Sequence, residues 1–186
     1  MRGLLDLLAV RVLLRPPTES DREPFVSAML QSETLHRPWI NDVATDAYFD
    51  RLLARADDER HDTRLVRLAD GDAIVGVFNL SEIVRGAFQN AFLSYAAVSG
   101  YERQGLMSEG LELMLERAFE ELELHRLEAN IQPPNAASIA LVKRAGFVYE
   151  GSSRRYLQVD GDWRDHQHWA MLAEDWRVRR AASPPR

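Results

Sequence analysis

The chain has 186 residues, of which 46% are hydrophobic and 28% are charged, and its formal net charge is −6. This length predicts one domain that buries its own core, with the composition of an ordinary soluble globular protein. The acidic balance argues against nucleic acid as the main partner and is compatible with a cationic partner.

The absence of cysteine excludes disulfide bonds and a thiol nucleophile, which fits a cytoplasmic protein. No apolar run is long enough to span a bilayer, so no membrane partner is expected. The segment 1–8 faintly resembles a signal start, but Asp6 and the missing cleavage pattern argue against a signal peptide.

The first half of the chain predicts a strand, two helices and a hairpin. Pro16 and Pro17 end the first strand, and Asp70-Gly71-Asp72 is a strong turn signal. The expected ranges are a strand over Val10–Arg15, a helix over Asp21–Leu30, a loop over Leu35–Ile40, a helix over Asp46–Asp58, and strands over Thr63–Ala69 and Ala73–Leu80.

The middle of the chain joins a buried strand to a helix through a glycine-containing loop. The strand is expected over Ala91–Val98, the loop runs from Gly100 to Gly110, and apolar residues then recur with helical period from Leu111 to Leu122. This arrangement favours phosphate binding, because N–H groups without intrahelical partners and the helix dipole face the anion. Gly105 has no Cβ and would let the backbone approach an anion closely.

The loop matches neither of two common phosphate motifs. The dinucleotide fingerprint G-x-G-x-x-G is missing, and although Gly105 and Gly110 have P-loop spacing, Leu111-Glu112 stands where Lys-Ser/Thr is required. On the loop alone, an ordinary strand-to-helix turn remains the alternative.

The second half predicts a strand over His125–Ile131, a helix over Ala136–Arg144 capped by Asn135, and two final strands about Asp160-Gly161-Asp162. The whole succession of elements is an α/β layout around one mixed sheet. The basic tail 177–186 is expected to be disordered.

The loop Glu102–Met107 resembles the acetyl-CoA loop of the GNAT superfamily of N-acetyltransferases, Q/R-x-x-G-x-G/A. Glu102 replaces the usual Gln or Arg of that motif, and Met107 replaces its small residue. The segments Asn135–Ser138 and Leu141–Phe147 are similar to the superfamily's N-x-x-S/A and L-x-K-x-G-F block.

Three further segments resemble the RimJ/RimL branch, the ribosomal-protein-alanine N-acetyltransferases: Leu35–Trp39, His125–Asn130 and Asp160–His166. Five blocks in the right order, between about Val10 and Trp176, identify the chain as a member of this family. The resemblance implies a single GNAT domain over residues 1–176. It also implies a mixed central sheet, helices on both faces, and a splayed strand pair at the acetyl-CoA cleft.

The implied reaction is acetyl transfer from acetyl-CoA to a primary amine. Backbone N–H groups of the loop would hold the pyrophosphate, and the strand before the loop would pair with the pantetheine arm. The residues implied for acetyl-CoA are Ala96, Ala97, Val98, Arg103, Gln104, Gly105, Leu106, Met107, Ser108 and Asn135.

Proton transfer needs an acid and a base. Val142 stands where many family members carry a Tyr acid, so we expect Ser138 or a water to take that role. Glu82 and Glu128, both on predicted strands beside the cleft, are the candidate bases. A terminal amine, with a reference pKa of about 7.7–8.0, needs only a weak base acting through water. Ser138 can instead be a helix-cap residue, and each glutamate a solvated strand residue.

On the acceptor side, Trp39 either walls the amine pocket or covers the edge of the core, and Asp165 and His166 order the acceptor. His166 and His168 share one strand face, but no third ligand is evident, so no metal is expected. Without cysteine, an acyl-cysteine route is excluded. Direct attack in a ternary complex remains.

Three functions stay open at this point. The first is acetylation of a protein N-terminus, such as that of a ribosomal protein. The second is acetylation of a small amine such as an antibiotic, an amino acid or a polyamine. The third is a catalytically silent acyl-CoA-binding module. The chain is expected to act as a monomer or homodimer without binding nucleic acid or membrane.

Overall fold

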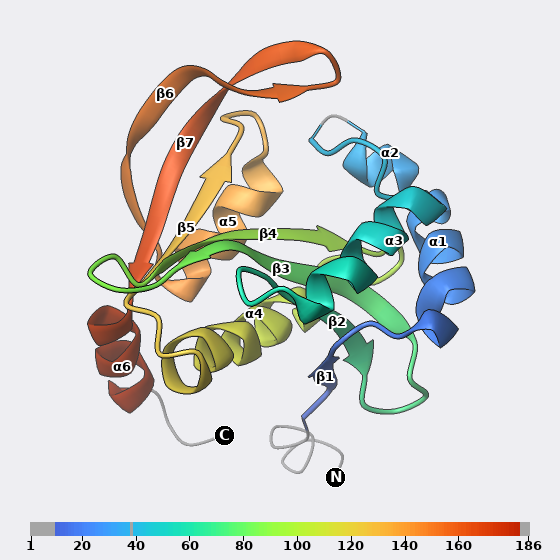
Figure 1. The fold of residues 1–186 in the computed structure, drawn as a ribbon, viewed down its shortest axis with the longest axis horizontal. Helices are drawn as coiled ribbons and strands as arrows, with labels where there is room; N and C mark the ends of the chain where they lie inside the picture. The colour runs from blue at the N-terminus through green and yellow to red at the C-terminus, as the bar shows by residue number, and fades with distance from the viewer. Residues whose placement is uncertain (1–9, 38, 183–186) are drawn as a thin grey trace, which may run out of the picture.

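The computed structural model describes residues 10–37 and 39–182. In this part of the chain, seven strands form one mixed sheet in the order β1-β2-β3-β4-β5-β7-β6 (Figure 1). The strands are β1 (Val12–Arg15), β2 (Asp62–Leu68), β3 (Ile74–Val84), β4 (Asn90–Ala97), β5 (Arg126–Ile131), β6 (Val148–Val159) and β7 (Asp162–Leu172). The α-helices are α1 (Arg22–Gln31), α2 (Glu33–His36), α3 (Asp46–Ala54), α4 (Leu106–Glu116), α5 (Ala136–Ala145) and α6 (Ala173–Ala182). None of these helices is long and apolar enough to cross a bilayer.

Helices cover both faces of the sheet, because successive side chains of a strand point to opposite faces. Val66 and Phe78 belong to the cluster that also contains buried residues of α4, α5 and α6. Their neighbours Leu65 and Val77 belong to a second cluster, with α1 and α3. We call these two surfaces the α4 face and the α1 face. The predicted α/β class, with a mixed sheet between two helical layers, is confirmed.

Strands β4 and β5 form the parallel pair of this sheet, and they remain paired over only three positions. The register joins Asn90 to Arg126, Ala91 to Leu127 and Phe92 to Glu128. β4 continues to Ala97 and β5 to Ile131 without further pairing to each other. We call this separation the β4–β5 divergence; it corresponds to the splayed pair expected from the sequence.

Three expected segments need correction. The expected loop over residues 35–40 begins inside the short helix α2, which ends at His36. The helix expected over Asp46–Asp58 ends at Ala54 and tightens into a 3₁₀ turn over Arg55–Asp57. The expected helix after the glycine loop starts earlier, at Leu106.

The expected disordered tail was wrong for residues 177–182, which complete helix α6. The helix is held in place because Trp176 is buried against Phe119, with the two rings 5.6 Å apart. Arg177 and Arg180 also pair with glutamates, Glu120 at 3.1 Å and Glu116 at 2.7 Å. Residues 1–9 and 183–186 of the predicted domain and tail lie outside the described residues.

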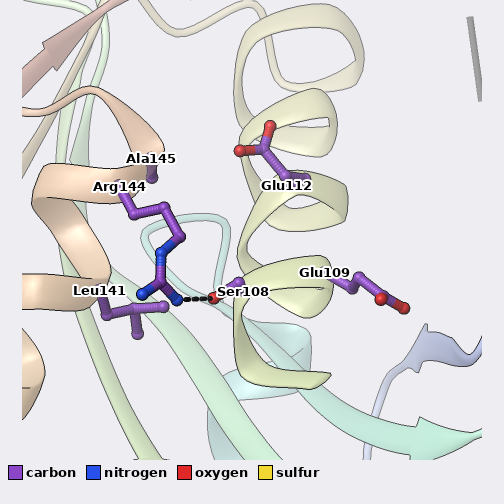
Figure 2. A pocket seen from close by; sticks show the side chains of 6 residues that line it. All are labelled: Ser108, Glu109, Glu112, Leu141, Arg144 and Ala145. Carbon is purple, nitrogen blue, oxygen red and sulfur yellow. Dashed lines mark hydrogen bonds between the residues drawn. The ribbon is translucent and has the colours of Figure 1, made fainter. Parts of the chain in front are cut away.

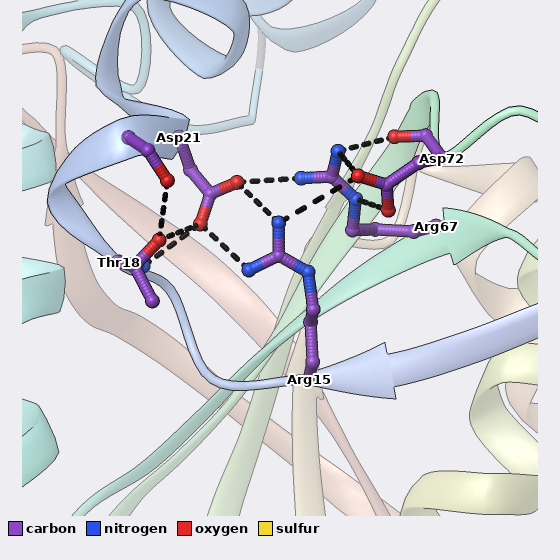
Figure 3. A network of polar contacts seen from close by, with 6 residues as sticks. Arg15, Thr18, Asp21, Arg67 and Asp72 are labelled. Carbon is purple, nitrogen blue, oxygen red and sulfur yellow. Dashed lines mark hydrogen bonds and ion pairs between the residues drawn. The ribbon is translucent and has the colours of Figure 1, made fainter.

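A buried ionic network joins β1 and the segment before α1 to the β2–β3 hairpin (Figure 3). Asp21, only 2% exposed, accepts hydrogen bonds from Arg15 at 2.6 and 2.9 Å and from Arg67 at 2.5 Å. Arg67 also binds Asp72 in the β2–β3 turn. Burial opposes ionisation of Asp21, but the hydrogen bonds from Arg15 and Thr18 outweigh it and lower the pKa of its carboxyl group. The network therefore joins β1, the segment before α1 and the β2–β3 hairpin.

We predict that Asp21→Asn lowers the free energy of unfolding by about 3 kcal/mol, because the buried Arg67 guanidinium then keeps only the exposed Asp72 as an anionic partner. Asp72→Asn is the matched control: its side chain is 69% exposed, so we expect a loss below about 1 kcal/mol. Urea denaturation at neutral pH measures both. Equal losses from the two variants would contradict a dominant role for Asp21. Since the pKa of folded Asp21 lies below the unfolded value of about 3.9, its contribution is complete above that pH and is lost as pH falls through the folded pKa.

Candidate active site

The loop after β4 ends in a helix N-terminus whose geometry suits an anion. Gly105 is the residue before α4 and has a φ of 80°, a left-handed conformation that side chains rarely adopt. The first intrahelical bond in this turn runs from the Glu109 N–H to the Gly105 carbonyl at 3.0 Å. The N–H groups of Leu106, Met107 and Ser108 therefore have no intrahelical acceptor and are available to a ligand.

Glu102, which replaces the motif's usual Gln or Arg, supports the loop from within. Its carboxylate accepts hydrogen bonds from the Gly100 N–H at 2.7 Å and from Ser99 Oγ at 3.3 Å. Bonds from its own backbone N–H and from Gly100 lower the pKa of Glu102. Gln104 donates back to the Gly100 carbonyl at 2.8 Å, while the Arg103 side chain is exposed. Glu102 thus shapes the loop.

Met107, which replaces the motif's small residue, is accommodated by a glycine on the sheet below it. A Cβ built at Gly76 would lie 2.6 Å from Met107 Sδ and 2.7 Å from the Ala96 carbonyl oxygen. The thioether therefore occupies the space that any larger residue on β3 would fill. The departure from the motif has a local structural compensation.

A small pocket of about 130 Å³ lies beside this N-terminus, between α4 and α5 (Figure 2). It is lined by Ser108, Glu109, Glu112, Leu141, Arg144 and Ala145. Arg144 reaches from α5 toward Ser108, with 3.5 Å between Nη1 and Oγ. The two acidic residues are paired elsewhere, Glu109 with Arg11 and Glu112 with Arg179. Arg144 thus places a cation next to the free N–H groups of α4.

The β4–β5 divergence leaves one edge of β4 without a strand partner. The Val98 N–H donates to the Val75 carbonyl of β3 at 2.7 Å. Backbone N–H and C=O groups of successive residues in a strand point to opposite sides. The backbone groups of Ala96 therefore also face β3, whereas those of Tyr95 and Ala97 face the divergence. Of the three residues expected to meet pantetheine, only Ala97 presents backbone groups there, and its carbonyl already accepts a bond from His36 Nε2 at 2.7 Å.

His36 and Trp39 connect the chain after α1 to the open end of the divergence. His36 lies at Ala97 on β4, and the Trp39 carbonyl is 3.5 Å from Gln132 Nε2, just beyond β5. Since His36 Nε2 donates to a carbonyl, Nδ1 carries the lone pair in the neutral ring. Nδ1 is buried, and no hydrogen-bond partner for it lies among the described residues. Burial lowers the pKa of His36 against the opposing effect of the Ala97 carbonyl.

Asn135 and Ser138, predicted from the sequence, lie together at the start of α5. Asn135 Oδ1 accepts the Ser138 N–H at 3.1 Å, so Asn135 is the helix cap. The Ser138 hydroxyl is therefore not needed for capping, and it lies 2.5 Å from the Tyr95 hydroxyl of β4. Burial raises the pKa of Tyr95 to about 12. The sequence motifs did not single out Tyr95. The available signal was a tyrosine inside a buried strand, whose O–H group needs a hydrogen-bond partner.

The two candidate bases occupy different places. Glu82 is exposed and sits at a bulge of β3 with a φ of 50°. Glu128 is opposite Phe92, the last paired position before the divergence, and accepts a hydrogen bond from Arg126 at 2.8 Å. Glu128 is therefore close to the point where the strands part, but an arginine already engages it.

Of the residues expected on the acceptor side, Asp165 and His166 lie on the projecting β6–β7 hairpin, whereas Trp39 lies after α2 (Figure 1). His166 is 4% exposed and Nδ1 donates to the Arg164 carbonyl at 3.0 Å. Burial lowers the pKa of His166. Asp165 accepts the Arg155 N–H at 2.8 Å and so holds a bulge in β6.

His168 uses both ring nitrogens. Nδ1 lies 2.6 Å from Asn130 Oδ1 and Nε2 lies 2.8 Å from Ser153 Oγ. Among the residues that the structure describes, no three His, Cys, Asp or Glu side chains are grouped to hold a metal ion.

We predict that the native state becomes less stable as pH falls below about 6.5, because buried His36 and His166 must gain a proton on acidification. Their folded pKa values are lowered, so their contribution is complete above 6.5 and decreases as pH falls toward the folded values. His36→Gln keeps an N–H donor for Ala97 without titrating. Urea denaturation at about pH 7.5 and about pH 5.5 should show a smaller loss in His36→Gln, by at most about 1.4 kcal/mol. Identical losses would mean that His36 does not titrate in this range.

Comparisons with known proteins agree with this arrangement. Residues 11–148 match the family model described as "Acetyltransferase (GNAT) domain". The chain is 39% identical over 107 residues to a Bacillus subtilis (strain 168) protein named "Probable N-acetyltransferase YjcK". It is 38% identical over 107 residues to the [ribosomal protein uS5]-alanine N-acetyltransferase of Escherichia coli (strain K12). Each match covers 58% of this chain, and it spans 59% and 55% of the respective relative's length.

Solved structures extend the likeness over nearly the whole chain. Mycobacterium smegmatis RimJ in complex with CoA-disulfide has a TM-score of 0.81 at 28% identity, covering 92% of this chain and 89% of that one. Vibrio cholerae spermidine N-acetyltransferase, in complex with CoA and spermine, has a TM-score of 0.77 at 17% identity. That second match covers 90% of this chain and 98% of the other, and it bears on the fold alone. With the family model matching residues 11–148, the chain belongs to the GNAT acetyltransferase family.

Proposed function

We propose that this protein transfers the acetyl group of acetyl-CoA to the N-terminal amine of a protein, of the ribosomal-protein-alanine type, by direct attack in a ternary complex. The observation that carries the proposal is the β4–β5 divergence next to a helix N-terminus with unpaired N–H groups. The 38% identity to a ribosomal-protein-alanine N-acetyltransferase supports the acceptor class. We place this activity in the cytoplasm.

The residues present fit acetyl-CoA. The free N–H groups at the start of α4, with Arg144 and Arg103 nearby, would hold phosphate groups. The unpaired edge of β4 at Tyr95 and Ala97 would bind the pantetheine arm as a further strand would. The pocket at Arg144, at about 130 Å³, suits a phosphate-sized part of the molecule.

Acetyl-CoA supplies an acetyl group already activated as a thioester, so the protein must align it, accept a proton from the amine and stabilise the departing sulfur. Ser138, at the start of α5, is the hydroxyl proposed to face the sulfur. Glu128 or Glu82 would take the amine's proton, directly or through water. Trp39, Asp165 and His166 would border the amine acceptor.

Acetylation of a small amine is the second candidate, since the overall fold is shared with a spermidine N-acetyltransferase. The acidic chain, with a net charge of −6, is compatible with either a basic peptide or a polyamine. A silent acyl-CoA-binding module is the third.

We predict that Gly105→Val raises the dissociation constant of CoA at least roughly tenfold, because a branched side chain obstructs the approach of phosphate to the backbone. Gly71→Val is the matched control. Its φ of 92° imposes similar backbone strain, yet it lies in the β2–β3 turn with nothing within 4 Å of the added Cβ. Titration calorimetry measures both affinities. In the unchanged protein, CoA at a hundredfold excess over its dissociation constant should raise stability by about 2.7 kcal/mol.

Equal affinity in the two glycine variants would place the phosphates away from Gly105. No stabilisation of the unchanged protein by CoA would remove the enzyme proposal itself.

We predict that a basic peptide beginning with alanine gives a kcat/KM at least roughly tenfold above that of spermidine, free amino acids or aminoglycosides. Release of the CoA thiol measures turnover for every acceptor in the panel. A higher value for spermidine would favour the small-amine function. Tight CoA binding without thiol release from any amine would favour the silent module.

A further inference from the structure

We propose that Tyr95 is a positioning residue for thiol release: its phenol donates a hydrogen bond to Ser138 Oγ, so that the serine's own hydrogen is directed at the sulfur of bound acetyl-CoA. The inference rests on the proposed function and deepens it. It assigns a role to a β4 residue that the sequence motifs do not contain.

The geometry of the pair favours this direction of donation. The Tyr95 hydroxyl lies 2.5 Å from Ser138 Oγ and 3.3 Å from the Ser138 carbonyl oxygen. That carbonyl is inside α5, where its regular partner is the N–H of Val142 four residues later. The phenol's single proton is therefore best used on Oγ, which is nearer and has free lone pairs.

Tyr95 remains a donor throughout the working range. Burial raises the pKa of its hydroxyl to about 12, so the phenol stays protonated at any pH where a terminal amine is partly neutral. Its ring is held against Phe78 with 5.5 Å between centroids, which fixes the position of the hydroxyl.

The hydroxyl hydrogen of Ser138 is not needed to cap α5. The N-cap interaction of α5 is made by Asn135, whose Oδ1 accepts the Ser138 N–H at 3.1 Å. With Oγ accepting from Tyr95, the serine hydrogen must find another acceptor, and the side chain stands between α5 and the unpaired edge of β4. This is where the thioester arm would lie if it pairs with that edge.

The reaction then balances as follows. The amine nitrogen forms a bond to the acetyl carbonyl carbon, the carbon–sulfur bond breaks, and its electron pair leaves on sulfur. The Ser138 hydroxyl donates to that thiolate and stabilises it. The proton lost by the amine nitrogen, carried by a base or water, equals the proton that the thiol finally gains. Tyr95 keeps its own proton and contacts no reacting atom.

The test compares Tyr95→Phe, Ser138→Ala and the double variant. Tyr95→Phe keeps the ring on Phe78 and removes only the hydroxyl. The first readout needs no acceptor: the thiol of bound CoA is titrated by the ultraviolet absorbance of its thiolate. We expect Ser138→Ala to raise the pKa of that thiol by about one pH unit, Tyr95→Phe to raise it by about half a unit, and the double variant to match Ser138→Ala.

The second readout is steady-state acetyl transfer. We expect Tyr95→Phe to lower kcat roughly three- to tenfold, with the CoA dissociation constant changed less than about twofold, and the double variant to be no slower than Ser138→Ala. Ser138→Thr, which restores a hydroxyl, should recover most of the thiol pKa. Tyr48→Phe is the matched control, because it removes the hydroxyl of another partly buried tyrosine, on the α1 face. It should leave both readouts unchanged.

The proposal is overturned if Tyr95→Phe leaves the thiol pKa unchanged while Ser138→Ala raises it, or if the two single losses multiply in the double variant. A loss of CoA affinity or thermal stability without a change in kcat would make Tyr95 a structural tie only. If no amine supports thiol release, the proposed function fails, while the titration of bound CoA still decides the role of Tyr95.

Discussion

The structure depends on the early separation of β4 from β5. A strand edge inside a protein carries N–H and C=O groups that are costly to leave unpaired, so it must find partners. Past Phe92, β4 has no strand partner on one side in the part of the chain that the structure describes, and only part of that edge is hydrogen-bonded. His36 takes the Ala97 carbonyl. Under the proposed function, the remaining backbone groups of Tyr95 and Ala97 would pair with an extended ligand that carries amides of its own.

The two helical layers are arranged around this separation. On the α4 face, α4 and α5 start near the divergence, one with an uncapped N-terminus and the other capped by Asn135. The different capping matters, since an uncapped end offers N–H groups to a ligand and a capped end does not. On the α1 face, the chain after α1 reaches both sides of the open end, at Ala97 and at Gln132.

The acidic side chains of α4 are paired with arginines other than Arg144, so Arg144 is left to face the candidate phosphate site. Each glutamate of α4 is paired with an arginine from a distant part of the chain: Glu109 with Arg11, Glu112 with Arg179 and Glu116 with Arg180. Arg144 instead extends to Ser108, at the helix start (Figure 2). Exposed pairs of this kind contribute little to stability, but they hold Arg11, just before β1, and helix α6 beside α4.

The sequence by itself determined the class of fold, the position of the glycine loop and the helix cap at Asn135. These features depend on residues close in the chain: apolar period, turn-forming glycine and a side-chain oxygen three residues before its N–H donor. Met107 and Glu102 looked like departures from a motif. The tertiary structure shows how each is accommodated: Met107 packs over Gly76 of β3, and Glu102 accepts a hydrogen bond from the Gly100 N–H.

Tertiary structure decided the pairings between distant segments. Tyr95 and Ser138 are 43 positions apart, and His36 and Ala97 are 61 apart. No local pattern predicts such contacts, because they depend on how far β4 and β5 diverge and on which helix crosses the gap. The same reason explains the C-terminal helix: the arginines of residues 177–182 are typical of a solvated tail, but Arg177 pairs with Glu120, just after α4, and Arg180 pairs with Glu116 of α4. Local sequence determined the helices and strands, and packing around the separated strands β4 and β5 determined which distant side chains meet.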